Sequence, residues 1–262
     1  MNIQLTSKNA LVGASTQGLG LAIAEELAKC GANVTLMARN EAKLKEITSL
    51  LPVVHENQVH QYLVADFSDF EKYQIIISDF FKNHTVDILV NNTNGPKAGT
   101  ALNQDVKSYQ QAFDLVFKTV CETTSLALPH MIKQKHGRII NVSSISVIEP
   151  IDNLVLSNAI RSATAAWAKT LSNEVAKHHI TVNNILTGYF DTERINDLID
   201  KQAISSGQTV SEIRKGRENE VPMKRLGKSE EYGYLVAFLA SEYASYLTGA
   251  SIPLDGGLAK SY

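Results

Sequence analysis

Leu11-Val12-Gly13-Ala14-Ser15-Thr16-Gln17-Gly18-Leu19-Gly20 is the stretch that decides the fold. An apolar run, residues 9–12, precedes it, and an apolar repeat at Leu19, Ile23 and Leu27 follows with helical spacing. The pattern predicts a buried strand that turns into a helix, where glycine permits close backbone approach. Free N–H groups at a helix start favour an anion such as a pyrophosphate. The turn is therefore a candidate floor for a dinucleotide, although the Gly-x4-Gly-x-Gly spacing alone also fits a plain strand-to-helix corner.

Composition narrows the class of protein. The chain has 262 residues, of which 44% are hydrophobic and 20% charged, and its net charge is −2. We expect one α/β domain over residues 1–262, with no nucleic-acid partner. Without a leader-like segment or a long apolar run, we expect no membrane contact and a cytoplasmic protein. Cys30 and Cys121 lack CxxC spacing, and the scattered histidines predict no metal site.

Strand and helix patterns alternate along the whole chain. This alternation predicts a doubly wound parallel sheet with helices on both faces, and ligands beyond the carboxyl ends of the strands. Beyond the glycine turn, the expected strands are residues 33–37, 60–64, 88–91, 138–143, 181–186 and 250–253, and the expected helices are residues 41–51, 68–82, 106–135, 157–177 and 229–241. Asn40, Ser68 and Thr209 are expected to cap helices.

Residues 187–228 break this rhythm after the sixth strand. They hold two short amphipathic patterns, one at about residues 193–204 and one opened by the capping box Thr209 to Glu212. An insertion at the carboxyl end of a strand predicts a helical lid over the binding crevice. Its apolar and charged residues are mixed, so the sequence selects no substrate class.

Several motifs together resemble the short-chain dehydrogenase/reductase family, nearest to its 3-oxoacyl-carrier-protein reductase-like branch. The resemblance runs nearly end to end and implies a Rossmann-type fold and a nicotinamide cofactor. It rests on the glycine turn, Asp66, Asn91-Asn92, the run Gly137-Arg138-Ile139-Ile140-Asn141-Val142-Ser143-Ser144, Val182-Asn183, and the tail from Phe238-Leu239-Ala240-Ser241 through Gly249 to Asp255-Gly256-Gly257.

The end of the second strand indicates which dinucleotide binds. An acidic residue there would bind the ribose diol of NAD, but the chain has Ala38 followed by Arg39. A guanidinium can pair with a 2′-phosphate, so we predict NADP(H), although Arg39 could also be a solvated loop charge. By resemblance, Asp66 binds the adenine amine and Asn91 positions the ribose region. The other expected cofactor-binding residues are Gly13, Ser15, Thr16, Gly18, Leu19, Gly20, Asn40, Phe67, Asn92, Arg161, Gly188 and Thr192.

The catalytic positions depart from the family pattern. Ser144 matches the family serine, but Ser157 and Arg161 stand where Tyr-x-x-x-Lys is usual, and Val116 replaces the helix asparagine. A serine hydroxyl is far less acidic than a phenol and shorter, whereas arginine keeps its charge and can still hold ribose hydroxyls. Ser157 also fits a helix cap. Tyr189 completes the expected catalytic set.

Other features leave alternatives open. Lys97 and Asp152 are further candidate proton donors, each of which also fits a solvated loop. The residues therefore allow an NADP(H)-dependent oxidoreductase acting on a small-molecule carbonyl/alcohol pair, a nucleotide-binding sensor or partner subunit without turnover, or a scaffold that has lost the nucleotide. Relatives commonly form tetramers, and the small face at Ala159, Ala163 and Ala166 suits a homotetramer or homodimer contact or packing on the sheet of the same chain.

Overall fold

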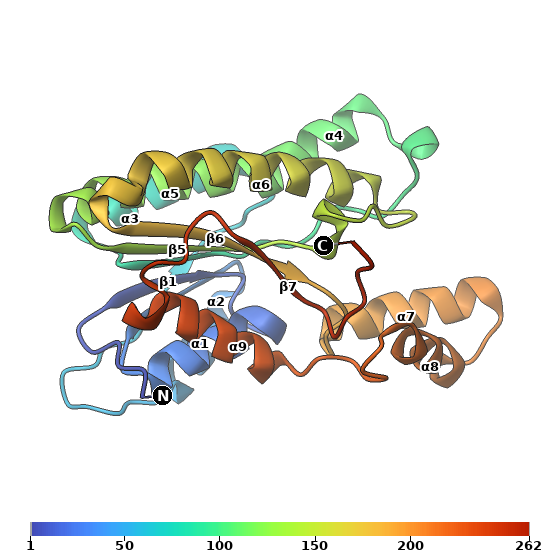
Figure 1. Ribbon diagram of the computed structural model, residues 1–262, viewed down its shortest axis with the longest axis horizontal. Helices are drawn as coiled ribbons and strands as arrows, with labels where there is room; N and C mark the ends of the chain where they lie inside the picture. Colours follow the sequence, from blue (N-terminus) through green and yellow to red (C-terminus); the bar gives the residue numbers. More distant parts are fainter. Residues whose placement is uncertain (1, 262) are drawn as a thin grey trace.

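A seven-stranded parallel sheet forms the centre of the molecule in the computed structural model, which describes residues 2–261 (Figure 1). The strand order is β3-β2-β1-β4-β5-β6-β7, so the order reverses between β1 and β4. Ligands bind at such a switch point in doubly wound sheets. The strands are β1 Asn9–Gly13, β2 Asn33–Ala38, β3 Gln61–Val64, β4 Ile88–Asn91, β5 Gly137–Val142, β6 Ile180–Thr187 and β7 Ser251–Leu254.

Helices cover both faces of this sheet (Figure 1). Helices α1, α2 and α9 supply the apolar core on one face, and α3, α5 and α6 supply the core on the other. The predicted fold class is therefore confirmed. The helices are α1 Gly18–Lys29, α2 Glu41–Leu50, α3 Phe70–Asn83, α4 Val106–Phe113, α5 Thr119–Gln134, α6 Val155–Val175, α7 Glu193–Ser206, α8 Val210–Glu220 and α9 Ser229–Ala240.

The two cores follow from the side-chain alternation of a strand. In β1, Ala10 and Val12 belong to the core on the α1 side, while Leu11 belongs to the core on the other side. Ile23 and Leu27 of α1 are fully buried against the first of these cores, as their spacing predicts. The strand and the helix that flank the glycine turn are thus anchored on both sides.

Three local predictions fail for identifiable reasons. The helix expected over residues 106–135 is interrupted by a π-helical turn at Asp114–Lys118. The prediction missed this turn because one wider turn leaves no mark in a hydrophobic repeat. Asp69, not Ser68, caps α3 by accepting from Lys72 N. Helix α6 begins at Val155, so Ser157 lies inside its first turn and is not the cap. The expected caps of α2 and α8 are confirmed.

The lid lies beyond the carboxyl edge of the sheet as a separate pair of helices, α7 and α8 (Figure 1). A small apolar cluster holds it together, with Ile195, Ile199 and Ala203 from α7, Ile213 from α8, and Leu226. Across residues 2–261, no helix is long and apolar enough to cross a bilayer.

Candidate active site

A cavity of about 850 Å³ opens at the carboxyl ends of β4, β5 and β6, beneath the lid. All four residues of the predicted catalytic set line it: Ser144, Ser157, Arg161 and Tyr189. They come from the loop after β5, from α6 and from the segment after β6. The fold thus brings together side chains that lie up to 45 positions apart in the sequence.

Ser144 stands at the end of β5, where the chain enters a single 3-10 turn, Ile145–Val147. Its Oγ accepts a hydrogen bond of 3.1 Å from Ser146 N, which orients the hydroxyl. The hydroxyl proton is left to donate to a ligand. The neighbouring Ser143 also lines the cavity, and its buried Oγ has no hydrogen-bond partner within residues 2–261.

Ser157 and Arg161 are four residues apart on α6, so their side chains share one face of the helix. Arg161 Nη1 donates to the carbonyl oxygen of Val142 at 2.7 Å, which fixes the guanidinium at the end of β5. Burial, followed by the nearby charge of Arg194, lowers the pKa of Arg161 to about 10. Arg161 therefore remains a cation at neutral pH, and no carboxylate within residues 2–261 forms an ion pair with it.

The alternative proton donors are less well placed. Burial, followed by the charge of Glu220, raises the pKa of Tyr189, so its phenol is a poorer acid than an ordinary tyrosine. The guanidinium of Arg217 lies 5.2 Å from the centre of the Tyr189 ring. Asp152 lines the cavity, whereas the exposed Lys97 is not among its lining residues.

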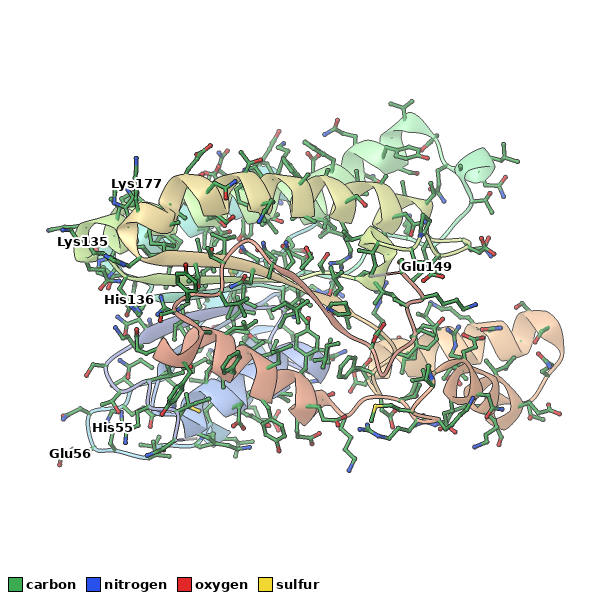
Figure 2. All side chains as sticks on the ribbon, in the orientation of Figure 1. His55, Glu56, Lys135, His136, Glu149 and Lys177 are labelled. Carbon is green, nitrogen blue, oxygen red and sulfur yellow. The ribbon has the colours of Figure 1, made fainter. Side chains whose placement is uncertain are left out.

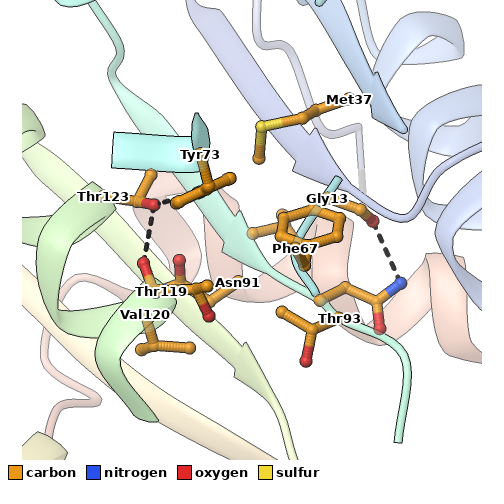
Figure 3. Close-up of a pocket in the computed structure, with 11 residues that line it drawn as sticks. Gly13, Met37, Phe67, Tyr73, Asn91, Thr93, Thr119, Val120 and Thr123 are labelled. Carbon is orange, nitrogen blue, oxygen red and sulfur yellow. Dashed lines mark hydrogen bonds between the residues drawn. The ribbon is translucent and has the colours of Figure 1, made fainter. Parts of the chain in front are cut away.

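The glycine turn lies beside this cavity and is closely packed. A Cβ atom at Gly13 would lie 2.2 Å from the carbonyl oxygen of Asn92, and one at Gly20 would lie 2.3 Å from that of Ala14. Asn92 Nδ2 also donates to the carbonyl oxygen of Gly13 at 3.0 Å, which ties the end of β4 to the end of β1 (Figure 3). Ala14 adopts a left-handed φ of 46°, which favours glycine. Both glycines are therefore required by the close packing of backbone within the turn.

A second group of predicted residues lies at the ends of β2 and β3. Arg39 is exposed there, and its charge contributes to lowering the pKa of Asp66. The larger causes of that shift are the hydrogen bonds from Ser68 N and Oγ to Asp66 Oδ1, at 2.9 and 2.7 Å. Asn40 uses its side chain to cap α2. Arg39 and Asp66 are thus neighbours at the edge where the sequence predicts the adenine ribose.

Some predicted cofactor residues use their side chains within the fold. The buried Ser15 Oγ accepts from Met37 N at 3.0 Å, and Asn91 Nδ2 donates to Thr124 Oγ1 and Asn141 Oδ1. Phe67 packs on Tyr73 with ring centres 5.3 Å apart, above a void of only about 10 Å³ (Figure 3). These side chains shape the floor of the crevice. Of the other predicted cofactor residues, Leu19, Asn92, Gly188 and Thr192 line the large cavity, and Gly18 lies against Thr192.

The tail of the chain is tied to the segment that follows β5. Glu149 Oε2 accepts from Lys260 N at 2.8 Å, and the labelled Glu149 lies beside the last residues of the chain (Figure 2).

Within the described residues, no group of three or more His, Cys, Asp and Glu side chains is placed to hold a metal ion.

Sequence reasoning missed three lid cations that also line the cavity: Arg194, Lys201 and Arg217. The charged residues of the lid are evident in the sequence, but the sides they face are not. Only the packing of α7 and α8 over the crevice separates the charges that face inward from those that face solvent.

Comparisons with known proteins agree with this geometry. The family model described as enoyl-(acyl carrier protein) reductase matches residues 13–259. A 3-oxoacyl-[acyl-carrier-protein] reductase FabG of Rickettsia conorii is 32% identical over 98% of both chains. The NADPH-dependent reductase BacG of Bacillus subtilis is 30% identical over 98% of this chain and all of the relative. An L-sorbose reductase of Gluconobacter frateurii, solved with NADPH and L-sorbose, superposes over the full length of both chains with a TM-score of 0.92 at 27% identity. The chain belongs to the short-chain dehydrogenase/reductase family.

Proposed function

We propose that this chain is an NADP(H)-dependent oxidoreductase that interconverts a small carbonyl compound and its alcohol with altered proton-transfer residues. The observation that carries the proposal is the single cavity in which Ser144 and Arg161 meet, directly beside the glycine turn. The relatives named NADPH-dependent reductase and FabG support the reaction class.

The nucleotide would lie across the switch point between β1 and β4. The first turn of α1 offers free N–H groups to the pyrophosphate, with Gly18 and Thr192 side by side there. Arg39 and Asp66 would meet the adenosine end, and the exposed guanidinium of Arg39 is free to pair with a 2′-phosphate. The solved reductase with bound NADPH supports this choice of nucleotide.

The residues around the substrate carbonyl would stabilise charge rather than deliver a phenolic proton. When bound, the nicotinamide supplies or accepts the hydride. The hydroxyl of Ser144 is oriented by Ser146 N and donates to the carbonyl oxygen. The fixed cation of Arg161 lies in the same cavity and favours the negative charge that develops there. Ser157 is too short and too weak an acid to act as the missing tyrosine does, so water is the final proton source.

Ligand titration followed by an activity assay tests the proposal. NADPH and NADH are titrated separately by fluorescence, and the same sample is then offered a panel of ketones and aldehydes. We expect tighter binding of NADPH and slow NADPH oxidation with at least one carbonyl compound, and loss of that activity in Ser144→Ala. Binding of neither nucleotide would refute the proposal.

A second candidate function is a nucleotide-binding subunit without turnover. Two observations favour it: Tyr189 is the only phenol among the lining residues, and its pKa is raised. This function predicts NADPH binding with no oxidation across the whole panel.

We also infer that the chain assembles as a homotetramer or homodimer through α6. Ala159, Ala163 and Ala166 are exposed on that helix and do not pack on the sheet of their own chain. A stripe of small side chains allows a second helix to approach closely. Sedimentation of the purified protein tests this inference, and a monomer at micromolar concentration would contradict it.

A further inference from the structure

The charges that line the active-site cavity are unbalanced. Four cationic side chains face it, Arg161, Arg194, Lys201 and Arg217, against the single carboxylate of Asp152. The chain as a whole carries a net charge of −2, so this excess is local. Like charges in one cleft repel one another and attract an anion.

Arg194 comes from the first turn of α7 and reaches across the mouth of the cavity. A Cβ atom at Gly95, in the loop after β4, would lie 2.5 Å from Arg194 Nη2, so the guanidinium rests on that loop. The residue is exposed overall, yet loss of solvent around its guanidinium lowers its pKa, and the charge of Asp197 only partly opposes this shift. Arg194 forms no ion pair within residues 2–261 that meets the usual 4.0 Å limit.

Arg217 reaches the cavity from the second lid helix, α8. Its Nη2 donates to Gln202 Oε1 at 2.7 Å, and its guanidinium lies over the ring of Tyr189. Its Nε is buried without a hydrogen-bond partner in the part of the chain that the structure describes. A buried donor left without a partner is costly unless a ligand satisfies it.

The other lid arginines are neutralised by carboxylates. Arg214 forms an ion pair of 2.5 Å with Asp191, and Arg225 pairs with Glu231 at 2.6 Å. Both pairs lie outside the residues that line the large cavity. Arg194 and Arg217, which face the cavity, form no such ion pair within residues 2–261, although the charge of Asp197 acts on Arg194.

We propose that the carbonyl substrate carries an oxyanion group, a carboxylate or a phosphate, which Arg194 and Arg217 bind under the lid. This inference rests on the proposed oxidoreductase function. The guanidinium fork matches the geometry of either oxyanion, and the cavity of about 850 Å³ has room for a small charged substrate beside the nicotinamide. The hydroxyl of Ser144 and the cation of Arg161 would then be available to bind the carbonyl oxygen.

Matched pairs of substrates test the inference in the protein with NADPH bound. Acetoacetate is compared with its methyl ester, and dihydroxyacetone phosphate with dihydroxyacetone. We expect the charged member of at least one pair to show a kcat/KM at least tenfold higher, and the pair that responds identifies carboxylate or phosphate.

Variants locate the effect. Arg194→Gln and Arg217→Gln should each raise the KM for the charged substrate about tenfold or more, with little change for its neutral analogue and an unchanged Kd for NADPH. Lys215→Gln removes a charge from α8 outside the cavity and should change none of these quantities. Turnover of the neutral compounds with equal or better efficiency would overturn the inference while leaving the oxidoreductase function intact. Absence of turnover with every compound would instead count against the proposed function.

Thermal shifts then test the anion site by themselves. Stabilisation of the NADP⁺ complex by acetoacetate or inorganic phosphate, abolished in Arg194→Gln, would support the anion site. No stabilisation by either anion would overturn the anion site.

Discussion

Restoring a phenol to the active site should accelerate the reaction if proton transfer limits it. Ser157 lies inside the first turn of α6 and lines the cavity together with Ser144 and Arg161. In Ser157→Tyr the new hydroxyl would extend into the cavity on the face of α6 that already carries Arg161. The fixed guanidinium, bound to the carbonyl oxygen of Val142 at 2.7 Å, would lower the pKa of that phenol.

The size of the effect follows from the chemistry. A positioned general acid contributes about 10²–10⁴-fold to a rate, equivalent to roughly 3–5 kcal/mol of barrier. We expect the lower end for Ser157→Tyr alone, because Arg161 is held at the end of β5 and cannot relay a proton. Ser157→Tyr combined with Arg161→Lys should come closer to the upper end, because an amine is more compact and can exchange protons.

The assay measures NADPH oxidation with the best compound of the carbonyl panel, at several pH values. Because the phenol acts in its protonated form, the rate gained by Ser157→Tyr should be lost as pH rises through the pKa of the new phenol. Ser157→Phe is the matched control: it adds the same ring without the hydroxyl and should give no gain. NADPH binding and circular dichroism show that each variant is folded and loaded.

One result would refute this reasoning. If Ser157→Tyr binds NADPH as tightly as the parent protein and is no faster than Ser157→Phe, proton donation at this position does not limit the reaction. The barrier would then lie in hydride transfer, or the parent protein would already have an effective donor.

Three further changes probe the nucleotide site, the glycine turn and the base of the lid. Arg39→Ala should raise the Kd for NADPH about tenfold in a fluorescence titration and leave the Kd for NADH unchanged. The effect is limited to about tenfold because the guanidinium of Arg39 is exposed, and an exposed phosphate contact is weaker than a buried one. Equal effects on both nucleotides would contradict the role given to Arg39. Ala14→Gly should raise the free energy of unfolding by roughly 0.5–1 kcal/mol in urea denaturation, since relief of the left-handed φ outweighs the added chain entropy; a loss of stability would show that the alanine methyl group matters more. Hydrogen bonds from Arg225 and from the backbone of Lys228 lower the pKa of Glu231 to about 2 in the folded state, so its stabilising effect is present above its unfolded pKa and is lost as pH falls from about 4.5 toward 2. Glu231→Gln should therefore lose less Tm over that range than the parent protein, and parallel Tm profiles would contradict this.

The sequence alone determined the fold and supplied the residues that we propose for the nucleotide site. Strand and helix periods are local properties of the chain, and the glycine turn places a strand end next to a helix start over ten residues. Asn40 and the capping box at Thr209 were predictable for the same reason, because a cap involves only neighbouring residues. The prediction that Ser157 and Arg161 replace the usual tyrosine and lysine likewise rests on the sequence, through their four-residue spacing.

Only the tertiary structure showed which charged side chains face the same cavity. Arg194 and Arg217 lie on different lid helices, and both have acidic residues as near neighbours in the sequence, so the chain order conceals their common direction. The π-helical turn at Asp114–Lys118 was also hidden, because one wider turn leaves no mark in a hydrophobic repeat. The structure likewise showed that Asn91 donates its amide to Thr124 of α5 and Asn141 of β5 rather than to the crevice. The two arginines and Asn91 share one physical reason: local patterns fix most of the backbone conformation, while the surroundings of a side chain depend on segments that are distant in sequence.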